Sequence, residues 1–298
     1  MLHRLVFPIV RDTARAQARF ALAFSLLSPF TALHAQRASA ISRPAPSDSL
    51  LTAITARGRA IAGYEEAVWQ ARAASPDPDF SRALQQIAIH TSSGWSVAFG
   101  RLSPTHDSFT VEQLATSRAI PFSPDTQFVV HTLATPLADT DTLLRAARAL
   151  DTAAALFSRL ARPGVPYQSV VLPTPGGDWL VYFLPAPTRP GVWPLGGDVR
   201  YRISADGERV RDMRRLHLSI IEFDRDSQPD ARYTPGSHTT EIDDVPEDTD
   251  VAHVLLRRPR VFEYVFTTEY LYMINEDGSI RLVMGRAGLL GMNVGNGG

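Results

Sequence analysis

One group of histidine and aspartate residues has the side chains and the spacing that a metal site needs. His238 lies in the polar stretch 236–240, and Asp250 closes a second polar stretch that begins at Pro246. His253 follows Asp250 by three residues, so the two side chains would share one face of a helix. Imidazole nitrogens and carboxylate oxygens are common zinc ligands. We therefore predict His238, Asp250 and His253 as candidate metal ligands.

Each of these residues also has an interpretation without a metal. Asp250 suits the N-cap of the helix expected after it, and His253 would then be an ordinary helix residue. His217 is a further candidate ligand, although it lies at the end of a strand-like segment, where a structural or surface histidine is the simpler interpretation. Both interpretations stay open at this point. If the metal-site interpretation holds, zinc is the expected metal. No other cofactor is predicted.

Segment 236–283 resembles the metal-binding region of the JAB/MPN metalloprotease family, whose motif is His-x-His-Pro, a short loop, then Pro-Ser-x-x-Asp. His238 matches the first motif histidine and Asp250 the motif aspartate, with Pro246 four residues before it. The resemblance implies a zinc ion bound by these side chains. The C-terminal half is also similar to exported bacterial proteins of unknown function, a similarity that implies no activity.

The chain departs from the JAB/MPN motif at two positions. Thr240 stands where the second histidine belongs, and Glu247 replaces the serine. No glutamate can be assigned as the base that activates water in that family. The resemblance therefore implies a divergent or inactive metal-dependent hydrolase.

A predicted β-hairpin carries a cluster of arginines on one face. If Asp206-Gly207 is a two-residue turn, Arg202 lies opposite Arg211, and Arg200 lies opposite Met213. Like charges opposite each other destabilise a sheet, so something must offset them. The clustered side chains are those of Arg200, Arg202, Arg209 and Arg211.

Two kinds of group could offset the arginines. Guanidinium groups bind carboxylate and phosphate, so an anionic ligand or a protein partner is one. The second kind of group is a nearby run of acidic residues, and we expect these residues to form an intramolecular network of ion pairs with the arginines. That run contains Glu241, Asp243, Asp244, Glu247, Asp248 and Asp250. The first functional prediction is thus a non-catalytic module that binds an unknown protein or small anionic ligand, and the alternative is the metal-dependent hydrolase.

The composition excludes several chemistries. The chain has no cysteine and no lysine, and all 30 basic residues other than histidine are arginine. Disulfides, thiolate metal sites, cysteine nucleophiles and lysine Schiff bases are therefore absent. Residues 1–40 hold five of the arginines and one of the 31 acidic residues, which leaves residues 41–298 with a net formal charge of −5. This acidic balance argues against nucleic-acid binding.

The first forty residues are typical of a secretory signal peptide. A basic segment that contains Arg4 and Arg19 precedes the apolar segment 20–33, and small residues follow. The apolar segment is too short for a stable transmembrane helix. We predict a secreted or periplasmic protein, cleaved after Ala35 or Ala40.

The remaining chain predicts an α+β fold in which an antiparallel strand meander packs against two or three helices. Helices are expected at 50–74, 79–88, 139–161 and from about 250. Strands are expected at 95–102, 109–115, 127–133, 168–172, 179–184, 199–204, 209–216, 261–267, 270–275 and 280–283.

The predicted domain plan has one folded unit. Residues 41–49 form a linker, 50–284 form a single domain with a sub-boundary near 163–166, and 285–298 form a flexible glycine-rich tail.

Overall fold

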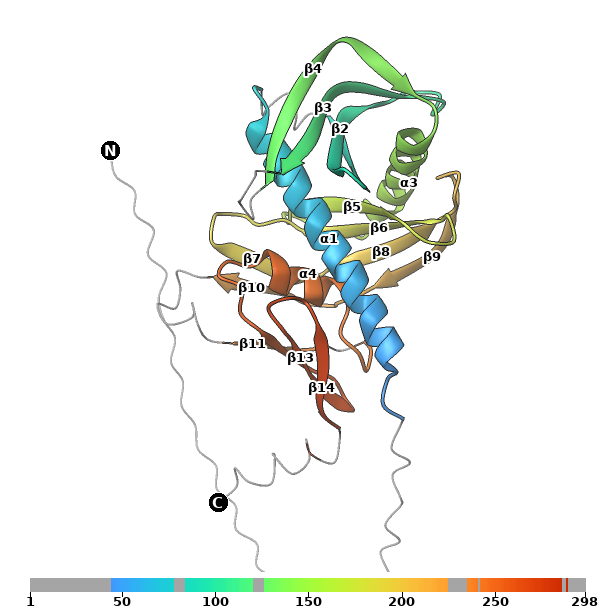
Figure 1. Ribbon diagram of the computed structural model, residues 1–298. Coiled ribbons are helices and arrows are strands. Elements are labelled where there is room, and N and C mark those ends of the chain that lie inside the picture. The colour runs from blue at the N-terminus through green and yellow to red at the C-terminus, as the bar shows by residue number, and fades with distance from the viewer. Residues whose placement is uncertain are drawn as a thin grey trace, which may run out of the picture. The chain divides into compact units, whose positions relative to one another are not determined.

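The computed structural model describes residues 44–77, 84–119, 126–224, 235–240, 242–285 and 288. These residues belong to one compact unit, Ser42–Gly298, of class α+β. Three four-stranded sheets, one two-stranded sheet and three helices make up the described part of this unit (Figure 1). The predicted fold class is confirmed. The predicted signal peptide and nearly all of the tail lie outside the described residues.

Helix α1 (Asp48–Ala74) contacts elements of all three four-stranded sheets and helix α4 (Asp248–Leu256). It begins where Ser47 Oγ accepts a hydrogen bond from the Leu50 N–H, 3.3 Å away. Gly58 permits the close approach to α4, since a Cβ there would lie 2.4 Å from Cβ of Val251. The helix that carries Asp250 is thus pressed directly against the longest helix.

The first sheet is an antiparallel meander of consecutive strands. Its strands are β1 (Gln85–Thr91), β2 (Gly94–Leu102), β3 (Phe109–Ala119) and β4 (Thr126–Asp139). The predicted helix 79–88 is wrong over 85–88, which begin β1, while 79–83 lie outside the described residues. Pairing with β2, with Gln85 opposite Gly100, overrides the local helical pattern.

Helix α3 (Thr142–Phe157) is shorter than the predicted helix 139–161. The Asp139 carboxylate accepts hydrogen bonds from the backbone N–H groups of Asp141 and Leu144, at 3.0 and 3.1 Å. This aspartate therefore satisfies amide groups at the start of the helix without being part of it.

The second sheet lies between two hydrophobic cores. Its order is β5 (Tyr167–Pro173), β6 (Trp179–Pro185), β8 (Val199–Ile203) and β9 (Val210–Arg215). Along β6, Val181 and Phe183 belong to the core that includes α3, whereas Tyr182 and Leu184 belong to the core that includes α1 and α4. This alternation is the period of a strand buried on both faces.

The β8–β9 hairpin does not have the predicted register. Ile203 pairs with Val210 as expected, but a bulge then shifts the pairing by one residue. Arg202 consequently lies opposite Asp212, not Arg211, and Arg200 lies opposite Arg214. The extra residue in β9 thereby separates the expected like-charge pair of Arg202 and Arg211, but it places Arg200 opposite another arginine, Arg214.

Two short strands that the sequence did not predict form the two-stranded sheet, β7 (Val192–Gly196) with β10 (Ile220–Asp224). The third sheet has the order β11 (Gly236–Thr239), β12 (Glu263–Phe266), β13 (Tyr270–Ile274) and β14 (Ile280–Gly285). Strand β11 pairs with β12 in parallel, and α4 lies between them in the chain. This crossover brings β11 and the first turn of α4 to the same region. None of the described helices is both long enough and apolar enough to span a membrane.

Candidate metal centre

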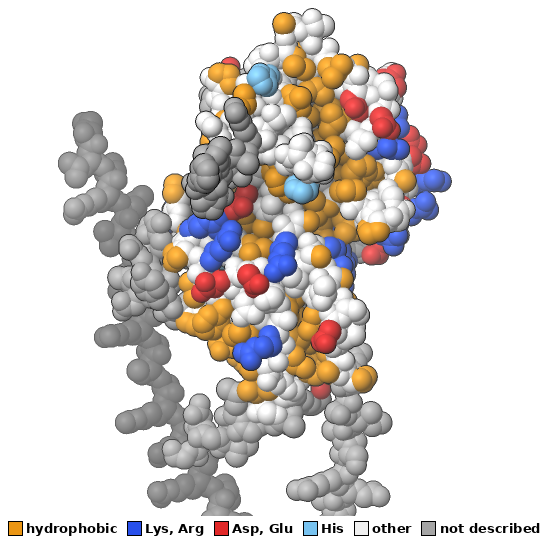
Figure 2. Space-filling view, viewed as in Figure 1, with side chains coloured by type: hydrophobic (Ala, Val, Ile, Leu, Met, Phe, Trp, Pro, Cys, Tyr) orange, Lys and Arg blue, Asp and Glu red, His pale blue; other side chains and the backbone are white. Residues whose placement is uncertain are grey.

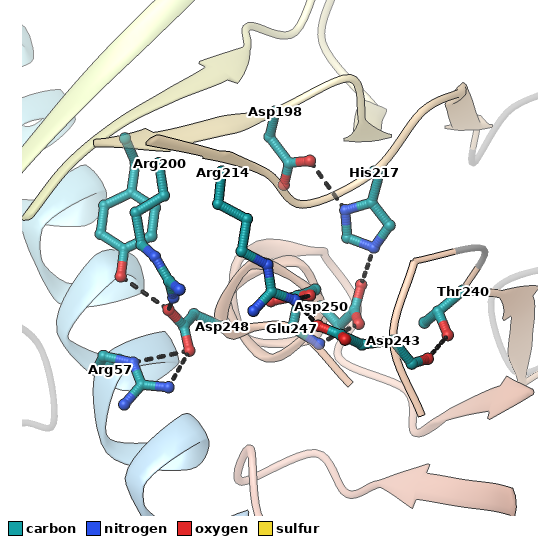
Figure 3. A network of polar contacts seen from close by, with 11 residues as sticks. Arg57, Asp198, Arg200, Arg214, His217, Thr240, Asp243, Glu247, Asp248 and Asp250 are labelled. Carbon is teal, nitrogen blue, oxygen red and sulfur yellow. Dashed lines mark hydrogen bonds and ion pairs between the residues drawn. The ribbon is translucent and has the colours of Figure 1, made fainter. Parts of the chain in front are cut away.

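Three segments bring two imidazoles to one carboxylate. His217 lies in the loop between β9 and β10, His238 in β11, and Asp250 in the first turn of α4. His217 Nε2 is 3.0 Å from Asp250 Oδ1, and His238 Nε2 is 3.1 Å from the same oxygen. Figure 3 shows the His217 ring pointing at the Asp250 carboxylate, with Asp198 on the other side of the ring. The three side chains are 8%, 1% and 0% exposed, so they meet inside the protein.

The two Nε2 atoms lie at ion-pair distance from Asp250 Oδ1, but the contacts lack hydrogen-bond geometry. Among the described residues, His217 Nε2, His238 Nε2 and Asp250 Oδ1 have no hydrogen-bond partner. All three lie within 4.8 Å of one another. Ligands about 2.0–2.1 Å from a tetrahedral zinc ion are separated by about 3.3 Å, close to the two nitrogen-to-oxygen distances of 3.0 and 3.1 Å. The spacing therefore suits a metal ion bound between the three atoms, and it also suits an ion pair of each protonated imidazole with Asp250.

The opposite side of each side chain is hydrogen-bonded. His217 Nδ1 lies 2.9 Å from Asp198 Oδ1, and His238 Nδ1 lies 2.7 Å from Glu263 Oε1. Asp250 Oδ2 accepts a hydrogen bond from the Glu247 backbone N–H at 2.7 Å. The other polar atom of each side chain, Nε2 of the two histidines and Oδ1 of Asp250, therefore faces the point where the three side chains meet.

The electrostatics of the centre follow from burial and charge. Burial lowers the pKa of both histidines, but nearby carboxylates, Asp250 foremost, more than reverse this effect. The pKa of His238 rises to about 9, and that of His217 rises well above its usual range. Burial raises the pKa of Asp250, but the two imidazoles hold it far below its usual range. Protons and a metal ion would therefore compete for the same two Nε2 atoms.

His253, predicted as a ligand, is not part of this group. It lies one helical turn beyond Asp250, and its Nε2 is 3.8 Å from Glu263 Oε2. Its ring packs against Phe223, with 4.7 Å between the ring centroids. Burial lowers the pKa of His253 to about 4, which keeps the imidazole neutral. The structure instead brings in His217, which the sequence suggested only as a further candidate.

A second polar group surrounds Asp248, two residues before Asp250 in α4. Arg57 Nε donates to Asp248 Oδ1 at 2.8 Å. Arg200 Nη1 and the Tyr182 hydroxyl donate to Oδ2 at 2.6 and 2.8 Å. Arg200, predicted to bind an anionic ligand, is thus paired inside the protein with a member of the acidic run (Figure 3).

The other arginines of the hairpin lie at the surface. Arg202 pairs with Asp178 at 2.7 Å and Arg209 with Asp206 at 3.5 Å, whereas Arg211 has no ion pair with a described residue. Arg214, which the sequence did not single out, pairs with Asp243 and Glu247. On the face shown in Figure 2, basic side chains lie beside acidic ones. Intramolecular pairs therefore offset most of the arginine charge.

The sequence did not predict Asp198 and Glu263 as site residues, because the residues around each of them are typical of a different role. Asp198 follows Gly196-Gly197 and looks like a turn residue, while Glu263 falls within a predicted strand. Thr240, at the position of the second motif histidine, donates its hydroxyl to the Asp243 carbonyl at 2.8 Å. The second imidazole of the centre comes instead from His217, earlier in the chain.

Comparisons with protein-family models, with curated proteins and with solved structures give no match to this chain. The resemblance to the JAB/MPN family stays a prediction, and the centre is interpreted from its own residues.

Proposed function

We propose that this chain is an exported zinc-binding protein in which His217, His238 and Asp250 are the protein ligands. The proposal rests on one observation. Three buried ligand atoms lie close together, and none of them has a hydrogen bond to a described residue. Two imidazole nitrogens and one carboxylate oxygen form a donor set typical of zinc. The same set also suits iron(II), which the binding experiment must distinguish.

Zinc binding is tested by titration of protein purified without a histidine tag, in competition with a chromophoric chelator. Wild type is expected to bind zinc stoichiometrically and more tightly than iron(II). His238→Ala and His217→Ala are expected to lose this binding. His106→Ala is a matched control, because that histidine is half exposed and lies outside the centre. Equal binding by all four proteins, or tighter binding of iron(II), would contradict the proposal.

Metal-dependent hydrolysis is the second candidate function. Three protein ligands leave one tetrahedral position for water, which is the ligand count of catalytic zinc sites. Zinc bound there would supply a water molecule of lowered pKa. The deep burial of all three ligands favours zinc binding without catalysis. Hydrolysis of peptide or ester substrates by the zinc-loaded wild type, but not by His238→Ala, would establish the enzymatic function.

Export is the part of the proposal that depends on residues 1–40. Their basic, apolar and small segments support it, as does the lack of cysteine. N-terminal sequencing of the native protein from fractionated bacteria is expected to find a chain beginning at Gln36 or Ile41. An intact Met1 in the cytoplasmic fraction would contradict export without affecting the metal centre.

A further inference from the structure

We infer that Asp198 and Glu263 are positioning residues, which hold the two histidines in the single tautomer that can bind the metal. This inference rests on the proposed zinc site and concerns what makes its histidines ligands.

Each carboxylate lies on the side of the ring away from the centre. Glu263 Oε1 is 2.7 Å from His238 Nδ1, and both side chains are 1% exposed. Asp198 Oδ1 is 2.9 Å from His217 Nδ1, with 1% and 8% exposure. The pairs come from different parts of the chain, since Asp198 precedes β8 whereas Glu263 begins β12. Two independent pairs thus present the same ring atom, Nε2, to one oxygen of Asp250.

The chemistry of imidazole explains why this matters. A neutral ring has one N–H group and one nitrogen lone pair, and only the lone pair can bind a metal. A carboxylate next to Nδ1 holds the proton there, which leaves the lone pair on Nε2 and makes that nitrogen a stronger donor. Without the carboxylate, the ring can place its proton on Nε2 and lose that lone pair.

Glu263 also lies beside an arginine and a second histidine. Its second oxygen lies 3.6 Å from Arg257 Nη1 and 3.8 Å from His253 Nε2. A carboxylate oxygen at hydrogen-bond distance from His238 Nδ1 favours a proton on that nitrogen.

The experiment compares Glu263→Gln, Glu263→Leu and Asp198→Asn with wild type. A glutamine can still accept a hydrogen bond from Nδ1 but carries no charge, whereas leucine removes the acceptor. We expect the zinc Kd to rise about 10-fold for Glu263→Gln and Asp198→Asn, and about 100-fold for Glu263→Leu. The absorption spectrum of the cobalt(II)-substituted protein is expected to change in the same order. Glu112→Gln is the control, since its carboxylate pairs with Arg101 at the surface and should leave both readouts at wild-type values.

The outcomes separate this inference from the zinc proposal. Absence of zinc binding by wild type would overturn both. Wild-type binding with an unchanged Kd and cobalt spectrum in all three variants would overturn the positioning role alone. Circular dichroism identifies any variant that fails to fold, and Asp198→Asn then tests the inference at the other histidine.

Discussion

Two carboxylates on one turn of α4, Asp248 and Asp250, are equally buried and yet differ in what surrounds them. Asp248 receives hydrogen bonds from two arginines and a tyrosine, which use both of its oxygens. Asp250 uses one oxygen for the Glu247 backbone N–H and directs the other at two imidazole nitrogens, which lie at ion-pair distance without hydrogen-bond geometry.

The difference shows how a structural site and a binding site can be distinguished in one element. The bonds of Asp248 join α1, the second sheet and α4, so its surroundings explain its burial. The outward oxygen of Asp250 has only ion-pair contacts with the two imidazole nitrogens, and a bound metal ion would be coordinated by all three atoms. The first group therefore has a structural role, and the second is the one for which we propose metal binding.

The largest expected effect comes from Asp248→Ala. It leaves the guanidinium groups of Arg57 and Arg200 without their buried partner, and breaking such a group costs about 3 kcal/mol or more. Urea denaturation of metal-free protein should show this loss. A free energy of unfolding equal to that of wild type would contradict the structural role of Asp248.

Zinc itself should stabilise the folded protein by a somewhat smaller amount. At a concentration about 100 times its Kd, a ligand that binds only the folded state adds about 2.7 kcal/mol. We expect zinc to raise the denaturation midpoint of wild type, EDTA to reverse the rise, and Asp250→Ala to abolish it. A zinc-dependent rise in Asp250→Ala equal to that of wild type would remove this carboxylate from the site.

His253 should make the metal-free protein sensitive to acid. Its pKa is about 4 in the folded protein, below the ordinary 6.5, because burial disfavours the charged ring. The neutral ring therefore contributes stability above pH 6.5, and this contribution is lost as pH falls toward 4. We expect His253→Gln to lose less stability than wild type between pH 7 and pH 4.5, by roughly 2 kcal/mol. Urea midpoints at the two pH values, with EDTA present, would show identical losses if the prediction fails.

The smallest expected effect is at the surface of the arginine hairpin. Arg202 is 54% exposed and pairs with Asp178, and such pairs contribute about 0.2–1 kcal/mol. Arg202→Ala should therefore change the free energy of unfolding by less than about 1 kcal/mol and leave zinc binding unchanged. A loss as large as that of Asp248→Ala would mean that the hairpin arginines form one cooperative network.

The sequence predicted the elements that carry strong local patterns. The regular apolar spacing of α1 and the Asp277-Gly278 hairpin between β13 and β14 are examples, and both are confirmed. The predictions from local pattern were wrong where pairing between strands decides the structure. Examples are β1, which was predicted as a helix, and the bulge of β9, which changes the hairpin register. The short strands β7, β10 and β11 carry no alternation long enough to recognise.

The site was predictable only in part for the same reason. Asp250 and His238 stood out because they lie in polar segments beside a helix and match part of a motif. His217 joins them only through the folding of the β9–β10 loop, and spacing along the chain cannot show that contact. Asp198 and Glu263 act on the site through the histidines, so no motif marks them.

The most direct test of the metal centre is crystallography of the zinc-loaded protein with data collected on both sides of the zinc absorption edge. We predict an anomalous peak about 2 Å from His217 Nε2, His238 Nε2 and an Asp250 carboxylate oxygen. A well-ordered centre without this peak, or zinc bound only at surface carboxylates, would contradict the account.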